Sequence, residues 1–146
     1  MTINPFDLHP DAVRPRTYFA QPITLFGTEL KSILLAKVRE RFLGDVIEDP
    51  DTPEHQAGYA RSGMGYYLEE VIPGCRRVVF LAFRDGMIGA GVYAEAEKVI
   101  AGGGTVFEIF PNGTIAERAG LDPARKLSVD ETRSRIRNED RSLKPY

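Results

Sequence analysis

The sequence predicts one α/β domain, a doubly wound, three-layer fold with a mostly parallel sheet of about five strands. Apolar strand-like runs alternate with segments of helical periodicity along the chain. The run VVFLAF at residues 78–83 is apolar without alternation, which is typical of a strand covered on both faces. A length of 146 residues suits a single hydrophobic core.

The chain is expected to begin with an arm and a short strand. Residues 1–15 are rich in proline and show little periodicity, so they predict an extended arm ahead of a domain at residues 16–146. A strand is expected at residues 17–20. It ends at Gln21-Pro22 because proline cannot donate to the ladder of a sheet.

A helix is expected next, at residues 28–42. Its apolar residues recur every fourth position on one face, namely Leu30, Leu34, Val38 and Phe42. A second strand is expected at residues 45–48. The acidic, proline-containing residues 49–60 predict a loop, either a lid or a disordered excursion. A helix at residues 63–72 should end at Pro73-Gly74.

The C-terminal half continues the alternation. A central strand, a helix and another strand are expected at residues 77–83, 92–101 and 105–110. Ser128 and Glu131 have the spacing of a capping box, which predicts a last helix running to about Asn138.

Composition excludes several classes of function. With 19 Lys and Arg against 21 Asp and Glu, the net charge of −2 gives no electrostatic basis for binding a nucleic acid polymer or a membrane surface. No segment reaches the ~20 apolar residues that span a bilayer. The single Cys75 excludes an internal disulfide, so we expect a cytoplasmic protein. His9 and His55 are the only histidines, so a multi-histidine metal site is not expected. No cofactor is expected.

The most informative segment is the turn after the central strand. It carries Gly89 and Gly91, and a helix bearing Glu95 in its predicted first turn follows. A helical wheel places Glu95 at the edge of the buried stripe and Glu97 in water. A helix N-terminus can hold an anion and favours an ionised acid by roughly 0.3–1 kcal/mol. The structural alternative is that Glu95 is a first-turn acid that only complements the helix dipole, and that Gly89 and Gly91 only form a tight turn.

Three segments together resemble the nucleoside 2-deoxyribosyltransferase superfamily, including its nucleoside 5′-monophosphate N-glycosidase branch. The segments are Tyr18-Phe19-Ala20-Gln21-Pro22, the run VVFLAF, and Gly91-Val92-Tyr93-Ala94-Glu95. Two positions depart from the pattern: Gly89 stands where deoxyribosyltransferases carry an Asp, and Gln21 stands where the family has Gly. A weaker similarity, to the glycine-rich loop of cytokinin-activating phosphoribohydrolases, points to the same reaction class.

The resemblance implies an enzyme that cleaves or transfers at the N-glycosidic bond of a nucleoside or nucleoside 5′-monophosphate. Glu95 would be the nucleophile, Tyr18 would hold Glu95 or the sugar, and Asp85 would bind a sugar hydroxyl or act as an acid. The implied substrate-binding residues are Gln21, Pro22, Glu69, Gly89, Gly91 and Arg133. A homodimer or higher homo-oligomer is expected, because family sites are often completed across a dimer.

Each of these residues also has a structural interpretation. Tyr18 would be a core aromatic, and Asp85 the first residue of an Asp-Gly turn. Glu69 would be a solvated helix acid, and Arg133 part of a charged surface helix. Three functions therefore stay open: the N-glycosidic-bond enzyme, a non-catalytic nucleotide-binding module of the same fold, and a structural subunit without a small-molecule site.

Overall fold

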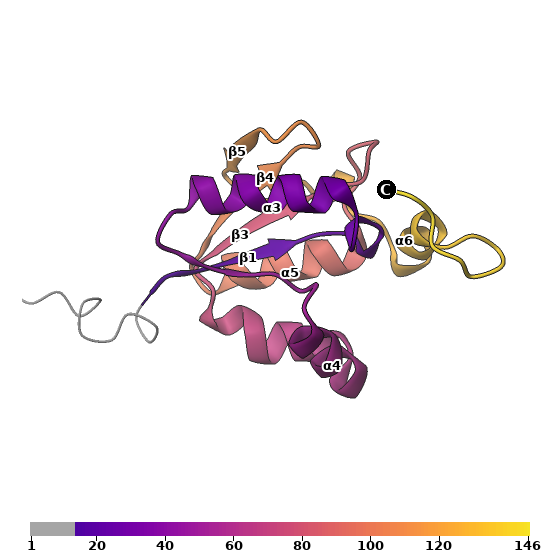
Figure 1. The fold of residues 1–146 in the computed structure, drawn as a ribbon, viewed down its shortest axis with the longest axis horizontal. Helices are drawn as coiled ribbons and strands as arrows, with labels where there is room; N and C mark the ends of the chain where they lie inside the picture. The colour runs from indigo at the N-terminus through magenta and orange to yellow at the C-terminus, as the bar shows by residue number, and fades with distance from the viewer. Residues whose placement is uncertain (1–13) are drawn as a thin grey trace, which may run out of the picture.

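The computed structural model describes residues 14–146, so nearly all of the predicted arm at residues 1–15 lies outside the described part of the chain. One five-stranded sheet, in the order β2-β1-β3-β4-β5, forms the centre of the fold (Figure 1). The strands are β1 (Arg16–Ala20), β2 (Val46–Glu48), β3 (Arg77–Leu81), β4 (Thr105–Ile109) and β5 (Ile115–Arg118). The first four are parallel and β5 is antiparallel to β4. The predicted α/β class and mostly parallel sheet are confirmed.

Helical segments cover both faces of the sheet (Figure 1). Helix α3 (Glu29–Arg41) lies on one face, where its Leu34 and Val38 pack against the strands. Helix α5 (Ala90–Ala101) packs on the other face, together with the π-helical segment η2 (Tyr66–Val71) and η3 (Ile72–Gly74). Successive residues of β3 point to opposite faces, so Val78 and Val79 belong to different core clusters. This explains why the central strand is apolar without alternation.

The structure corrects the predicted loop at residues 49–60. Helix α4 (Pro53–Ser62) occupies most of it, with Thr52 as N-cap accepting a hydrogen bond from the His55 backbone N–H. Proline suits the first position of a helix, where its missing N–H costs nothing. Sequence reasoning took proline and acidic residues as loop signals because α4 has almost no apolar stripe, and only His55 and Gly58 in it are buried.

Other boundaries also differ from the prediction. The edge strand β5 was not predicted, because four residues of mixed polarity that border water carry little pattern. The helix expected from residue 92 begins at Ala90, with Gly89 as its N-cap. The last helix, α6 (Val129–Ile136), has the predicted capping box of Ser128 and Glu131. Two short helical turns, η1 (Ile23–Leu25) and η4 (Pro123–Arg125), complete the fold.

The strand order places a topological switch point between β1 and β3. From β1 the chain moves to β2 on one side, and it then returns to β3 on the other side. The connections therefore diverge at the carboxyl ends of β1 and β3, where parallel α/β sheets form their ligand crevices. Helix α6 lies beyond these strand ends (Figure 1). Within residues 14–146 no helix combines the length and apolar character needed to cross a membrane.

Candidate functional site

A cavity of about 640 Å³ opens at the carboxyl ends of β1 and β3. Five segments build its wall. They are the turn after β1, helix α4 with the loop that precedes it, the loop before α5 with the first two turns of that helix, the segment around η2, and α6 with the C-terminal tail. The residues that line the cavity are Gln21, Pro22, Ile23, Phe26, Pro50, Gln56, Tyr59, Met64, Tyr67, Phe83, Gly89, Gly91, Val92, Glu95, Thr132, Arg133, Ile136, Arg137 and Leu143. Its volume suits a ligand of nucleoside or nucleotide size.

Glu95 lies on the buried side of α5 and lines this cavity. The predicted helical face is confirmed, since Glu95 is 6% exposed and Glu97 is exposed. The predicted position in the first turn is wrong: α5 starts at Ala90, which puts Glu95 in the second turn. Burial raises the pKa of Glu95 to about 8, although a hydrogen bond from Tyr18 acts in the opposite direction. Desolvation therefore outweighs the hydrogen bond from Tyr18, and the protonated form of Glu95 dominates at pH 7.

Tyr18 is fully buried in β1, and its hydroxyl donates a hydrogen bond to the carboxyl group of Glu95. Burial and the neighbouring Glu95 raise the pKa of Tyr18 well above its usual value. Tyr18 therefore keeps its proton and stays a donor over the working pH range. A fixed donor of this kind stabilises the carboxylate form of Glu95.

The glycines sit where the backbone of α5 meets the cavity. A Cβ on Gly89 would lie 3.3 Å from both Phe83 and Thr132, so glycine lets the α5 N-terminus approach these side chains closely. The Ala90 N–H donates to Thr132 Oγ1 at 2.9 Å, which means that α6 already satisfies one of the helix's free amides. The first-turn amides of Gly91 and Val92 have no acceptor within the helix by its geometry, and both residues line the cavity.

Apolar and aromatic side chains make up most of the remaining wall. Tyr59, Met64, Tyr67 and Phe83 are among them. Burial, followed by the charge of Glu95, raises the pKa of Tyr67 to about 12, and its hydroxyl contacts the backbone oxygen of Pro50 at 3.3 Å. Flat apolar side chains around a single carboxyl group suit a ligand with a planar, uncharged part.

The other predicted site residues divide into two groups. Gln21 and Pro22 line the cavity next to the end of β1, and Gln21 is buried. Arg133 borders it from α6, with a side chain that is 76% exposed and an Asp130 carboxylate 3.8 Å away. The remaining two, Asp85 and Glu69, do not line it.

Asp85 lies on the loop after β3, exposed to solvent. Its carboxylate accepts from the Met87 backbone N–H at 3.1 Å and pairs with Arg135. Burial would raise the pKa of Asp85, but the hydrogen bonds from Met87 and Arg135 hold it below the usual value. This is the geometry of an Asp-Gly turn. Glu69 is an exposed residue of η2.

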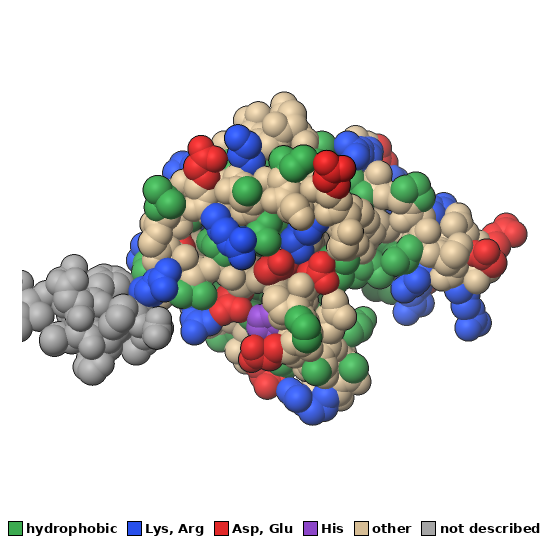
Figure 2. Space-filling model, in the orientation of Figure 1, with side chains coloured by type: hydrophobic (Ala, Val, Ile, Leu, Met, Phe, Trp, Pro, Cys, Tyr) green, Lys and Arg blue, Asp and Glu red, His purple; other side chains and the backbone are tan. Residues whose placement is uncertain are grey.

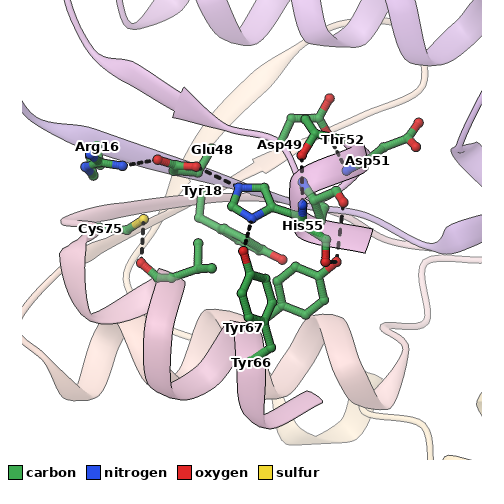
Figure 3. Close-up of polar contacts among 12 residues, drawn as sticks. Arg16, Tyr18, Glu48, Asp49, Asp51, Thr52, His55, Tyr66, Tyr67 and Cys75 are labelled. Carbon is green, nitrogen blue, oxygen red and sulfur yellow. Dashed lines mark hydrogen bonds and ion pairs between the residues drawn. The ribbon is translucent and has the colours of Figure 1, made fainter. Parts of the chain in front are cut away.

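A chain of polar contacts fastens α4 beside the cavity (Figure 3). His55 Nε2 lies 2.9 Å from a carboxylate oxygen of Glu48, and its Nδ1 lies 2.5 Å from the hydroxyl of Tyr66. The carboxylate requires the proton on Nε2, so Nδ1 accepts from Tyr66. Glu48 also pairs with Arg16 of β1. In Figure 2 acidic side chains surround the purple histidine, which marks this anchored region.

Several cavity residues were missed by sequence reasoning. Gln56 and Tyr59 were hidden because a loop was expected in place of α4, and Tyr67 was not among the predicted site residues. Tyr66 and Tyr67 are both buried in the core cluster that α5 joins, so their adjacency in the sequence did not single out Tyr67 as a cavity residue. Thr132 and Ile136 gave no signal, because only the tertiary fold brings α6 against the α5 N-terminus.

The arrangement combines one desolvated carboxyl group, a phenol that donates to it, and an apolar cavity with free helix amides at one end. Such a site can host nucleophilic or acid–base chemistry by Glu95 on a bound organic ligand. When the chain is compared with protein-family models, curated proteins and solved structures, no match is found.

Proposed function

We propose that the protein cleaves or transfers at the N-glycosidic bond of a nucleoside or nucleoside 5′-monophosphate, with Glu95 as the nucleophile. The observation that carries the proposal is the buried Glu95 in the wall of a nucleoside-sized cavity, with its carboxyl group accepting a hydrogen bond from Tyr18. The doubly wound, flavodoxin-like (Rossmann-like) arrangement of the layers supports it, because the cavity lies at the switch point where such folds bind ligands.

The proposed reaction begins with a carboxylate oxygen of Glu95 attacking the anomeric carbon of the sugar. The C1′–N bond breaks, its electron pair stays on the base nitrogen, and that nitrogen takes up a proton. A glycosyl ester on Glu95 results. Water then attacks C1′ of this ester and gives up a proton, so that the free sugar forms, or the ring nitrogen of a second base attacks C1′ to give a new nucleoside. The carboxylate of Glu95 is restored in either case.

The wall of the cavity supports the binding side of the proposal. Tyr59, Tyr67 and Phe83 offer apolar surface for a planar base. The free amides of Gly91 and Val92, with Arg133 and Arg137 at the rim, provide donors for a sugar or phosphate oxygen. The exposed side chain of Arg133 is also free to reach a second copy of the chain, in keeping with the proposed homo-oligomer.

A second candidate function is a nucleotide-binding module without catalysis. Two observations favour it. The pKa of Glu95 at about 8 leaves most of its carboxyl groups protonated at pH 7. Gly89 also supplies no acid at the position where deoxyribosyltransferases carry an Asp. A protein of this kind would bind the ligand and leave its glycosidic bond intact.

One assay separates the two functions. The protein is incubated at pH 8.5 with nucleosides, deoxynucleosides and 5′-monophosphates, with and without a second base, and free and exchanged bases are measured by chromatography. The enzyme predicts base release or exchange that is lost in Glu95→Ala and retained in Glu97→Ala, a change on the exposed side of the same helix. Ligand-dependent thermal stabilisation without turnover would support the binding module instead. If neither effect occurs, both candidate functions are wrong.

A further inference from the structure

We infer that the turn after β1 recognises a hydrogen-bond donor on the ligand through Gln21 Oε1, and that Asp49 and Lys31 are the residues that position this amide. The inference rests on the proposed function for the identity of the ligand, a nucleoside or nucleotide. Beyond the proposed function, the inference says which kind of chemical group on the ligand is recognised at the end of β1.

The starting observation is a pair of buried atoms without partners. Among the side chains of residues 14–146, two buried polar atoms make no hydrogen bond, Gln21 Oε1 and Thr24 Oγ1. Both belong to the short segment that joins β1 to α3, and Gln21, Pro22 and Ile23 of this segment line the cavity. Thr24 does not line the cavity, but Gln21 does. Buried polar groups in folded proteins are almost always paired, so the unpaired oxygen of Gln21 points to a group that a ligand brings.

The orientation of the Gln21 amide is fixed by its surroundings. Its Nε2 donates to the backbone oxygen of Phe19 at 3.1 Å and to Oδ1 of Asp49 at 3.2 Å. Both partners are acceptors only, so both amide hydrogens are in use. Turning the amide over would set Oε1 against two other oxygen atoms. Oε1 is therefore held away from them as an acceptor with no partner in the described chain.

Asp49 is itself held in place. Its Oδ1 accepts from Lys31 Nζ at 2.8 Å and from the backbone N–H of Asp51 at 3.1 Å, in addition to Gln21. Lys31 is 5% exposed, so its ammonium group is committed to this position and cannot turn into solvent. Figure 3 shows Asp49 and Asp51 on the segment that leads into α4. Lys31 therefore holds the carboxylate of Asp49, and this carboxylate in turn holds the amide of Gln21.

This network makes the end of β1 selective for one ligand chemistry. A carbonyl oxygen accepts hydrogen bonds and repels other acceptors, so Gln21 favours a hydroxyl or an amino group and disfavours a phosphate or carbonyl oxygen. A ligand without the donor leaves Oε1 buried and unpaired, which is the situation in which binding sites discriminate most strongly. Adenosine offers two sources of such a donor, the hydroxyls of the sugar and the exocyclic amino group of the base.

Equilibrium affinities test the inference. The Glu95→Gln protein, which does not consume the ligand, is titrated calorimetrically with adenosine, 2′-deoxyadenosine, 3′-deoxyadenosine and purine riboside, each as the nucleoside and as the 5′-monophosphate. We expect one analogue to bind at least about tenfold more weakly than adenosine or its monophosphate. If purine riboside is the weak binder, the donor is the amino group of the base. If a deoxy analogue is the weak binder, the donor is the hydroxyl that this analogue lacks.

The variants decide whether Gln21 causes that difference. Gln21→Met removes the acceptor at similar length, and Gln21→Asn serves as a shorter second variant; both should abolish the discrimination. Asp49→Asn should reduce it, because the amide of Gln21 can then turn. Asp51→Asn is the matched control. It removes a carboxylate 3.6 Å from Lys31 without touching Gln21, so the discrimination should stay.

Several outcomes overturn the inference. Equal binding of all analogues, or discrimination that persists in both Gln21 variants, removes the role of Gln21 even if Glu95-dependent base release is observed. Equal effects of Asp49→Asn and Asp51→Asn remove the positioning role of Asp49. If no compound of the panel binds, the inference fails, and the base-release assay with the wider set of nucleosides decides the proposed function separately.

Discussion

The hydroxyl of Tyr18 donates to the carboxyl group of Glu95 across 77 residues of sequence, from the middle of β1 to the second turn of α5. Both side chains are buried, and Glu95 lines the cavity at the switch point. This contact joins the first strand to the helix after the central strand. It also opposes the rise in the pKa of Glu95 that burial causes.

The first prediction concerns the pH dependence of catalysis. A nucleophilic Glu95 must be ionised and its pKa is about 8, so kcat/KM should rise about tenfold per pH unit below pH 8 and level off above it. Tyr18→Phe removes the donor that lowers this pKa, so the profile should move to higher pH and activity at pH 7 should fall by at least about tenfold. Initial rates from pH 5.5 to 10 measure both. An activity that falls as pH rises towards 8 would assign Glu95 the role of an acid.

The second prediction concerns stability at the same residue. The folded-state pKa of Glu95, about 8, lies above the ordinary value of 4.5, so between these pH values the folded protein binds more protons than the unfolded chain. The free energy of unfolding should therefore fall as pH rises through this window, by up to about 1.4 kcal/mol per pH unit from this group. Glu95→Gln should remove that contribution and be more stable than the wild type above pH 8.

Urea unfolding at pH 5.5, 7 and 8.5 measures this effect. Glu97→Gln, on the exposed side of α5, is the control and should keep the wild-type slope. If Glu95→Gln shows the same pH dependence as the wild type, the carboxyl group is not desolvated as described.

The third prediction concerns a buried ion cluster in β4. Glu108 is 1% exposed, and its carboxylate accepts from Arg125 and Arg118. Burial would raise the pKa of Glu108, but these hydrogen bonds hold it below the usual value. Arg125 also donates to the backbone oxygen of Gly86 at 2.8 Å, so it ties the loop before α5 to the sheet. Arg125→Met should destabilise the fold by roughly 3–5 kcal/mol, and Arg118→Met by less.

Denaturant unfolding at pH 7 ranks the two variants. The pH dependence of this stabilisation follows from the lowered pKa of Glu108. The contribution of Glu108 to the free energy of unfolding is present above the ordinary carboxyl pKa, and it is lost as pH falls through the folded-state pKa. The difference between the wild type and Arg125→Met should therefore shrink in acid. An equal loss in both arginine variants would contradict the bridging role given to Arg125.

The fourth prediction tests how α4 is seated. A Cβ on Gly58 would lie 2.2 Å from Tyr66 Cε1, so Gly58→Ala must displace the ring that donates to His55. We expect a loss of about 1–3 kcal/mol in the free energy of unfolding. Gly65→Ala is the control: Gly65 has helical backbone angles and no atom within 4 Å of its would-be Cβ, so this variant should be neutral or slightly stabilising. Thermal unfolding of both proteins measures the effect, and equal melting temperatures would refute the close packing.

Local patterns in the sequence were enough for the outline of the fold. Apolar periodicity predicted α3 and α5 within a few residues, because side chains that repeat with the period of a helix share one buried face. Short apolar runs predicted β1, β3 and β4, because strands in the middle of a covered sheet are apolar on both faces. The capping box at Ser128 and Glu131 marked the start of α6 for a similar local reason. Helix α4 and strand β5 were not predicted, because each is short and mostly polar. Packing against the rest of the chain decides their structure.

The candidate site divides in the same way. The helical repeat was enough to predict that Glu95 lies at the edge of the buried stripe of its helix and that Glu97 lies in water. It is the packing of remote elements that raises the pKa of Glu95, closes the cavity with α4 and α6, and leaves Asp85 outside it. Desolvation and distance between remote segments depend on how the elements pack in three dimensions, and no local pattern of residues encodes them.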